Sequence, residues 1–333
     1  MTVTIGRREL LVALGGAAAA WPLAARAQPN RLRRLGLIMA VGKTPEYVAA
    51  LTSFQQALAL LGWKQGDNLR IDDRWSAGSQ EAARAAAQEI AALNPDVILG
   101  QSAAVVEALL SMTRSIPIVF LHVADPVIYG FVSNLARPEG NVTGITNIVP
   151  SIGSKWLQLL KEIAPALTRA ALLVNPETQP DRGAIFLNPF EDAARSLGVT
   201  SVKSKVHDVK GIETLMAGLA TEPGGGVVVI PDAFFASHST QIVALAERFR
   251  LPAVYPYRYY VAQGGLLSYG VNNVDLFRQA APYVDRILRG AKPSDLPIQQ
   301  PTRFQLVINM KTAKVLNLTV PQSLQASADE VIE

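Results

Sequence analysis

Three short apolar runs in this chain each stop at a polar residue beside a proline. The three stops read Asp125-Pro126, Asn175-Pro176 and Pro231-Asp232. The runs before them show no polar alternation, which is typical of strands buried on both faces of a parallel sheet. Proline lacks a backbone donor and biases the preceding residue toward an extended conformation. The pattern therefore predicts an α/β fold whose strands end sharply, with polar side chains at their carboxyl ends, where ligands bind in open sheets.

The stretch 116–147 joins what we predict to be two domains. It opens with a strand at 116–123, passes through the turn Arg137-Pro138-Glu139-Gly140 and closes with a strand at 142–146 that contains Gly144. At 333 residues the chain is too long for one ordinary core and suits two domains of about 150 residues each.

Strands and helices alternate on both sides of this crossing. Before it we expect strands at 35–40, 69–75, 96–100 and 116–123, and helices at 45–61, 79–93 and 102–112. After it we expect strands at 170–174, 199–206, 226–230, 253–255, 266–269 and 304–308. We expect a helix that starts at Ser151 or Ser154 and ends at 163, and further helices at 184–197, 210–220, 239–249, 275–288 and 311–316. The acidic tail from Pro321 is expected to lie on the surface. This alternation predicts two doubly wound parallel sheets with right-handed crossovers.

Residues 1–27 have the features of a secretory signal peptide. Arg7-Arg8 precedes an apolar run at 10–20 that is too short to span a bilayer, and Ala25-Arg26-Ala27 fits a small-x-small cleavage site. The arginine pair resembles a twin-arginine export signal, although Leu10 stands where phenylalanine is usual, and the Sec route stays open. We expect export to the periplasm with cleavage near Ala27.

Charge and cysteine content exclude several classes of function. Removal of three arginines and one glutamate with the signal peptide would reduce the net charge from +4 to about +2, which does not indicate a nucleic-acid surface. The sequence has no cysteine, which excludes disulfides, thiol catalysis and zinc-thiolate sites, and we expect no lipid anchor at the mature N-terminus. No segment after the signal reaches the roughly 18 consecutive apolar residues that a membrane helix needs.

The motifs of common enzymes are missing from the sequence. The three histidines, His122, His207 and His238, have no metal-ligand spacing, and no G-x-S-x-G elbow precedes a helix. The glycines at 224–226 come before a strand and therefore indicate a turn rather than a phosphate loop. We predict no catalytic residue, no metal and no cofactor. His122 suits a core position in its strand, with a ligand contact as the alternative.

Three residues stand where a buried strand meets a helix and suit a ligand carboxylate. Gln101, Ser102 and Ala103 offer free backbone N–H groups, a hydroxyl and the positive end of a helix dipole. The alternative for Ser102 is a plain helix N-cap, and one side chain can do both.

Two aspartates suit a ligand ammonium group, one from each domain. Asp125, followed by Pro126, and Asp232 both lie at strand ends. The alternative for each is a side chain that stabilises its own turn. Asn175 has the same two possibilities.

Aromatic and polar side chains near other strand ends complete the predicted site. Tyr47 and Thr44 follow the first strand, and Tyr255 leads a cluster with Tyr257, Tyr259 and Tyr260. These rings could cover an apolar ligand group or pack loops against helices.

Several motifs occur in one order along the chain. They are ADPV at 124–127, N-L-x-R-P-x-G-N-V-T-G at 134–144, GGLLSYG at 264–270, YVDRILRG at 283–290 and LVIN at 306–309. This order resembles the periplasmic substrate-binding proteins of ABC transporters, in the branch related to tryptophan- and aromatic-amino-acid-binding receptors.

The resemblance implies that the helix at 275–288 returns to the first domain. We then expect lobe 1 to comprise 32–146 with 272–300, and lobe 2 to comprise 147–271 with 301–333. The chain would cross between lobes near Thr146, Asn272 and Thr302. Three crossings make a hinge with a cleft between the lobes, as in the type I periplasmic binding protein fold.

The function that this resemblance implies is ligand binding without catalysis. The lobes would close on a small ligand in the cleft, an amino acid or related carboxylate with an aromatic or branched apolar side chain, and present it to ABC permease subunits. We expect a monomer that binds no nucleic acid and touches the membrane only through the permease. The alternatives are a ligand sensor for a membrane signalling partner and, less favoured, a secreted enzyme.

Overall fold

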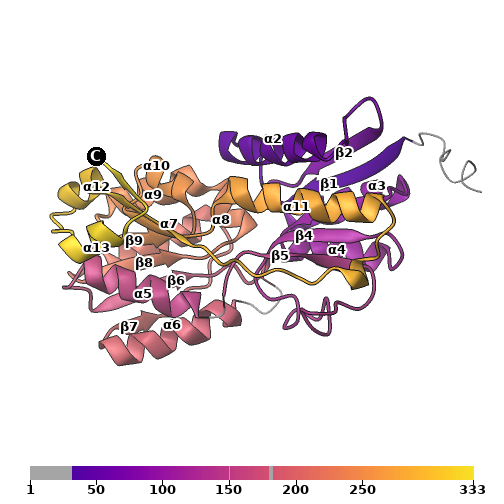
Figure 1. The fold of residues 1–333 in the computed structure, drawn as a ribbon. Coiled ribbons are helices and arrows are strands. Elements are labelled where there is room, and N and C mark those ends of the chain that lie inside the picture. Colours follow the sequence, from indigo (N-terminus) through magenta and orange to yellow (C-terminus); the bar gives the residue numbers. More distant parts are fainter. Residues whose placement is uncertain (1–31, 150, 180–182) are drawn as a thin grey trace, which may run out of the picture.

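The computed structural model describes residues 32–149, 151–179 and 183–333, so the predicted signal peptide lies outside the described residues. They form two β-sheets, each with helices on both faces (Figure 1). The predicted α/β class with two sheets dominated by parallel strands is confirmed. We call the part around the first sheet lobe 1 and the part around the second lobe 2.

The sheet of lobe 1 is parallel throughout its described strands. Its order is β2-β1-β3-β4-β5, which places the first strand in the interior. The strands are β1 (Arg33–Met39), β2 (Leu69–Trp75), β3 (Val97–Gln101), β4 (Ile118–Val123) and β5 (Val142–Thr146). All residues of the central strand β3 and of the edge strand β5 are buried, as their apolar runs predict.

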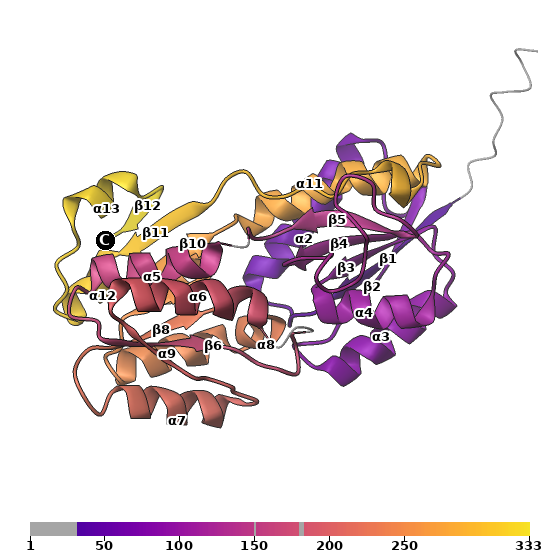
Figure 2. The same cartoon turned by 90° about the horizontal axis from the view of Figure 1, so that it is seen from below.

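Helices α3 (Gln80–Ala92) and α4 (Ala103–Met112) pack together on one face of this sheet, and α2 (Pro45–Leu60) packs with α11 (Asn273–Leu288) on the other (Figure 2). Thr44 caps α2, Pro45 opens its first turn, and its buried residues recur at helical spacing. Although α11 is far along the sequence, its Asp285 carboxylate accepts a 2.8 Å hydrogen bond from the Trp63 indole nitrogen. A helix that lies between strands β10 and β11 of the second sheet in sequence therefore completes lobe 1 in space.

The sheet of lobe 2 has the order β12-β11-β10-β9-β8-β6-β7 and is parallel except between β10 and β11. Its strands are β6 (Arg169–Leu173), β7 (Thr200–Val202), β8 (Gly225–Val229), β9 (Ala253–Tyr255), β10 (Leu267–Gly270), β11 (Gln305–Asn309) and β12 (Glu330–Ile332). Helices α5 (Ile152–Ile163) and α6 (Ala184–Leu197) lie against one face, and α7 (Val209–Leu219) and α9 (Ser239–Arg248) against the other.

Three parts of lobe 2 differ from the sequence prediction. The strand expected at 199–206 is β7 alone, followed by a single bridge between Val174 and Lys205. The short helices α8 (Ala233–Ser237) and α10 (Arg258–Ala262) were not predicted. After α12 (Met310–Val315) and α13 (Gln322–Ser327), the acidic tail adds strand β12 to the sheet. Its Glu330 carboxylate takes two hydrogen bonds, of 2.6 and 2.5 Å, from the Arg258 guanidinium.

No helix in the described ranges has both the length and the apolar composition that a bilayer crossing requires.

Gly144 in β5 lies against the backbone of β4. A Cβ atom at this position would stand 2.3 Å from the carbonyl oxygen of Phe120 and 2.7 Å from its amide nitrogen. These atoms belong to the sheet and cannot turn away as a flexible side chain could. Glycine therefore permits the normal spacing between the two strands.

We expect Gly144→Ala to lower the free energy of unfolding by about 2 kcal/mol or more, because the methyl group forces β4 and β5 apart. Urea denaturation followed by circular dichroism measures the change. Gly218→Ala in α7 is the control, because its Cβ would meet nothing within 4 Å. The control should gain about 0.5 kcal/mol from helix propensity. Equal stability of the two variants would contradict the role of Gly144.

Candidate functional site

A cavity lies between the lobes and encloses about 660 Å³ of empty space, part of it open to solvent. Every strand of the lobe 1 sheet is followed directly by a residue that lines this cavity. These residues are Ala40, Ser76, Ser102, Ala124 and Asn147. Lobe 2 supplies lining residues a little beyond the ends of β6, β8 and β9, namely Thr178, Gln179, Pro231, Asp232 and Tyr257. The carboxyl ends of both sheets therefore meet at one cavity.

The N-terminus of α4 forms part of the wall on the lobe 1 side. Ser102 has the left-handed backbone angle φ of +86°, and its hydroxyl oxygen accepts a 3.4 Å hydrogen bond from the Val105 amide. It is an N-cap and also lines the cavity, so both predicted roles remain open to it. The next residues, Ala103 and Ala104, line the cavity too, and their amides have no intrahelical acceptor because they start the helix.

The Gln101 amide is held by the backbone of a neighbouring strand. Its Oε1 accepts a 3.0 Å hydrogen bond from the buried Ala40 amide, so its Nε2 points the other way, toward His122 Nδ1 at 3.3 Å. The opposite ring nitrogen, His122 Nε2, lies 3.0 Å from Asn273 Oδ1 at the start of α11. The ring lines the cavity and is otherwise enclosed by protein, and this burial lowers the pKa of His122 to about 4.

His122 reaches the cavity because β4 is irregular at that residue. The pairing of β4 with β5 shifts register between Leu121 and Val123, and His122 has a φ of +56°. A bulge of this kind turns a side chain out of the regular alternation. The sequence left the choice between core and ligand contact open, and it carries no signal for the bulge.

Asp232 is the one acidic side chain that lines the cavity in the described part of the chain. Its Oδ1 accepts from the amides of Phe234 and Phe235 at 2.8 and 3.2 Å, which caps α8. Its Oδ2 accepts from the Thr178 hydroxyl at 2.5 Å and the Gln179 side-chain amide at 2.8 Å.

The charge of Asp232 has no counterion at this site. Among the described residues it makes no ion pair, and the cavity lining contains neither lysine nor arginine. Burial raises its pKa, and the four hydrogen bonds only partly offset this effect. A cationic group in the cavity would therefore lower the free energy of the ionised carboxylate. The four donors already occupy the carboxylate's lone pairs, so an ammonium group would displace one of them or act through charge alone.

Asn147 and Tyr257 connect the first crossing to lobe 2. The Asn147 side-chain amide donates a 3.0 Å hydrogen bond to the Tyr257 hydroxyl. The Asn147 Oδ1 is buried and accepts no hydrogen bond from the described residues. An unsatisfied buried acceptor is costly, so this oxygen is suited to a donor within the cavity.

The two lobes also touch each other directly. The Tyr129 hydroxyl of lobe 1 lies 3.4 Å from Gln179 Oε1 of lobe 2. Gly78, after β2, approaches the start of α8 so closely that a Cβ would stand 3.0 Å from the Phe234 Cα. The lobes are therefore in contact in this conformation.

The structure brings five of the ten predicted site residues to the cavity wall: Tyr47, Gln101, Ser102, Ala103 and Asp232. The other five are Thr44, Asp125, Pro126, Asn175 and Tyr255, and they do not line it.

Local contacts explain why three of these polar side chains lie outside the cavity. The Asp125 carboxylate accepts from the amides of Val127 and Ile128 at 2.9 and 3.0 Å, and Ala124 faces the cavity in its place. Asn175 Oδ1 accepts from the Glu177 amide, and Thr44 caps α2. These contacts show that the side chains of Asp125 and Asn175 stabilise their own turns, which is the alternative that the sequence left open for both residues.

Tyr255 faces a different hollow, next to α9 and α12. Its neighbour two residues on, Tyr257, faces the cavity between the lobes, and sequence reasoning had named it only as part of the tyrosine cluster. Thr178 and Gln179 were missed, because the motif in the loop after β6 marks Asn175, whose side chain closes its own turn, and not the residues three and four positions later.

The described residues contain no cluster of three histidine, aspartate or glutamate side chains that could hold a metal ion.

We expect Tyr257→Phe to lower the free energy of unfolding by about 1–3 kcal/mol, because the buried Asn147 amide then loses its partner. Thermal denaturation of the two proteins at neutral pH measures this change. Tyr255→Phe is the matched control, because its hydroxyl makes no hydrogen bond with any residue that the structure describes. A loss of similar size in the control would contradict the assignment.

Comparison with known proteins assigns this architecture to a family. A family model described as ABC transporter substrate binding protein matches residues 38–332. A tyrosine-binding protein of Clostridioides difficile (strain R20291) is 25% identical over 275 residues, covering 82% of this chain and 78% of that protein.

Two solved structures have the same fold. A conserved domain protein from Vibrio cholerae has a TM-score of 0.83 and 26% identity, covering 90% of this chain and 100% of that one. An ABC domain in complex with L-Trp from Streptococcus pneumoniae has a TM-score of 0.82 and 25% identity, covering 90% and 99%. The fold is that of a type I periplasmic binding protein, and the chain belongs to the ABC transporter substrate-binding protein family, whose members bind solutes and are not enzymes.

Proposed function

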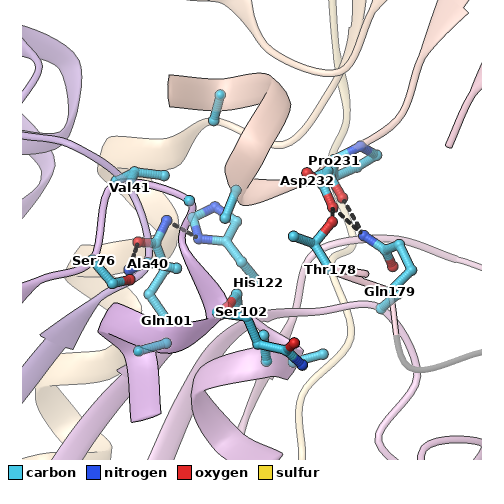
Figure 3. A pocket seen from close by; sticks show the side chains of 18 of the residues that line it. Ala40, Val41, Ser76, Gln101, Ser102, His122, Thr178, Gln179, Pro231 and Asp232 are labelled. Atoms are coloured by element: carbon cyan, nitrogen blue, oxygen red, sulfur yellow. Dashed lines mark hydrogen bonds between the residues drawn. The ribbon is translucent and has the colours of Figure 1, made fainter. Parts of the chain in front are cut away.

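We propose that this protein is the periplasmic solute receptor of an ABC importer and closes its lobes around an amino acid. The observation that carries the proposal is the buried, uncompensated charge of Asp232, which lies across the cavity from the N-terminus of α4 (Figure 3). Two relatives support the same ligand class, since one is described as tyrosine-binding and another was solved with L-Trp.

The polar groups of the cavity match the two charged ends of a zwitterion. On lobe 1, the N–H groups at the start of α4 and the Ser102 hydroxyl favour a carboxylate. On lobe 2, the Asp232 charge favours an ammonium group. The unpaired oxygen of Asn147, directly after β5, offers a further acceptor. A ligand bearing both charges would satisfy both sides, whereas a simple anion would leave Asp232 without a counterion.

Aromatic side chains near these groups suit a ligand with an apolar or aromatic side chain. Tyr47, Tyr129, His122 and Tyr257 all line the cavity. The His122 and Tyr257 rings meet edge to face, with centroids 5.6 Å apart. Such rings give an apolar wall together with polar tips that can bind a ligand group.

Closure would move two bodies about the three chain crossings. We propose that residues 32–146 with 272–300 form one body and 147–271 with 301–333 the other. The contacts of Tyr129 with Gln179 and of Gly78 with α8 would form on closing and break on opening. Binding energy would then select the closed form, which a permease could recognise. A sensor that signals to a membrane partner would use the same motion.

The first experiment is a thermal-shift screen of residues 28–333, unfolded and refolded to remove any bound ligand. L-Tyr, L-Trp, L-Phe and branched amino acids are compared with tyramine, which lacks the carboxylate, and with 3-(4-hydroxyphenyl)propionate, which lacks the ammonium. An amino acid at 100 times its Kd should stabilise the fold by about 2.7 kcal/mol, and either truncated analogue by much less. Equal shifts with the analogue that lacks the ammonium would contradict the role of Asp232.

We expect Asp232→Asn to weaken amino acid binding by about 2 kcal/mol or more, roughly thirtyfold, because the ligand ammonium loses its counterion in a closed cleft. Asparagine keeps an oxygen for the N-cap of α8, so the fold should survive. Asp125→Asn is the matched control and should bind within about threefold of the wild type, because it caps a turn outside the cavity. Isothermal titration calorimetry measures both. Unchanged affinity in Asp232→Asn would rule out the proposed pose.

A further inference from the structure

A chain of hydrogen bonds fixes the proton of His122. The buried Ala40 amide can only donate, so Gln101 must present its Oε1 to Ala40 and its Nε2 to the imidazole. His122 Nδ1 must therefore accept. The ring is neutral and carries its proton on Nε2, which donates to Asn273 Oδ1 at 3.0 Å.

This arrangement connects three separate segments to the cavity wall. Ala40 follows β1, Gln101 ends β3, and Asn273 begins α11 directly after the second crossing between lobes. Asn273 is only 3% exposed, and its orientation toward His122 leaves its Nδ2 without a hydrogen bond among the described residues. His122 thus links the strand ends that face the ligand cavity to a hinge segment.

We infer that His122 is a proton-linked positioning residue: its neutral form holds Gln101 and Asn273 in place for the closed, ligand-bound state, and its protonation weakens ligand affinity. This inference rests on the proposed binding function and goes beyond it, because it assigns a pH response to a specific side chain.

Protonation would place two donors against each other. An imidazolium carries N–H groups on both nitrogens, so its Nδ1–H would face the Gln101 NH₂ group. Gln101 cannot turn over to relieve this, because its NH₂ would then face the Ala40 N–H. The hydrogen bond between the Gln101 side chain of β3 and the His122 ring would therefore break.

Among the described residues, none that contacts the ring carries a charge to balance an imidazolium in the closed form. The Asn273 oxygen favours the protonated ring, and burial outweighs this effect in setting the pKa of His122. Tyr47 of α2 and Tyr257 of lobe 2 meet the ring edge-on, and burial raises the pKa of both phenols, so they remain neutral. Phe277 and Asn273 of α11 and Gln101 of β3 carry no charge.

Two carboxylates are close enough to add to the pH response. Glu46 of α2 contacts Asn273, and burial raises its pKa. Asp232 lines the same cavity, and its pKa is also raised by burial. Both would lose charge as the pH falls, so the test must separate them from His122.

The direction of the effect follows from proton linkage. In the closed form burial lowers the pKa of His122 to about 4. When the lobes open, Tyr257 would move away from the ring, and the pKa of His122 would return toward about 6.5. The open form therefore binds more protons. The ligand affinity should be highest above pH 6.5 and fall as the pH decreases toward 4. The largest loss of affinity expected between pH 7 and pH 5 is roughly twentyfold.

The test compares the wild type with His122→Gln, using L-Tyr as the probe. Glutamine does not titrate, and its amide can accept from Gln101 and donate to Asn273. Kd is measured by calorimetry at pH 7.5, 6 and 5, with melting temperature as a check of folding. The wild-type Kd should rise about tenfold or more by pH 5, while His122→Gln shows a much smaller rise. A parallel rise in the two proteins would overturn the inference.

Further variants isolate the other titrating groups. His207→Gln, an exposed histidine paired with Glu177 at 2.9 Å, should keep the full wild-type pH dependence. Glu46→Gln and Asp232→Asn should each retain the His122 part of it. Loss of the response in Glu46→Gln with its retention in His122→Gln would assign the effect to Glu46 and overturn the inference.

A second readout does not depend on the ligand. Nitrogen NMR of the ligand-free and L-Tyr-saturated protein, with the three histidines assigned through their glutamine variants, reports tautomer and pKa directly. His122 should carry its proton on Nε2, and its pKa should fall when L-Tyr binds. A proton on Nδ1, or a pKa near 6.5 in the L-Tyr complex, would overturn the inference. If L-Tyr does not bind at pH 7.5, the proposed ligand fails, and the tautomer in the free protein still decides the role of His122.

Discussion

Parallel strands all end at the same edge of their sheet, and this constraint brings the residues of the candidate site together. In lobe 1 the residue after each of the five described strands lines the cavity, from Ala40 to Asn147. Lobe 2 turns the corresponding edge toward the same space. The sheets are buried and apolar, so polar groups gather where the strands stop. The site is thus a direct result of topology, and its chemistry depends on which side chains occupy a few positions.

Those few side chains create an uneven electrostatic environment. Lobe 2 contributes one buried carboxylate, Asp232, held by four donors but by no cation of the described chain. Lobe 1 contributes neutral donors and the start of α4. Because the opposite charges of a ligand would be met by different lobes, attraction at both ends would favour lobes that lie close together. Recognition and closure are then parts of one equilibrium.

Much of the fold could be predicted from sequence, because apolar runs and helix caps are local signals. The helix 184–197 and the strands 69–75, 142–146 and 253–255 have the boundaries expected. The site was harder. Tyr255 and Tyr257 lie two residues apart, yet only Tyr257 reaches the cavity. Asp125 lies one residue past Ala124, the residue that lines the wall. The bulge that exposes His122 is set by pairing between β4 and β5, which no local pattern encodes.

The return of α11 to lobe 1 has a consequence for how the chain folds. Trp63 bonds to Asp285, 222 positions later, and α11 covers the face on which α2 also packs. A growing chain therefore makes all five strands of the first sheet long before the helix that shields them exists. Until residue 288 is available, α2 alone covers that face, and the surface that α11 will bury stays exposed and prone to aggregation. Lobe 1 begins first in the sequence but can complete its folding only late. A chaperone, or slow release of the growing chain, would therefore assist its folding.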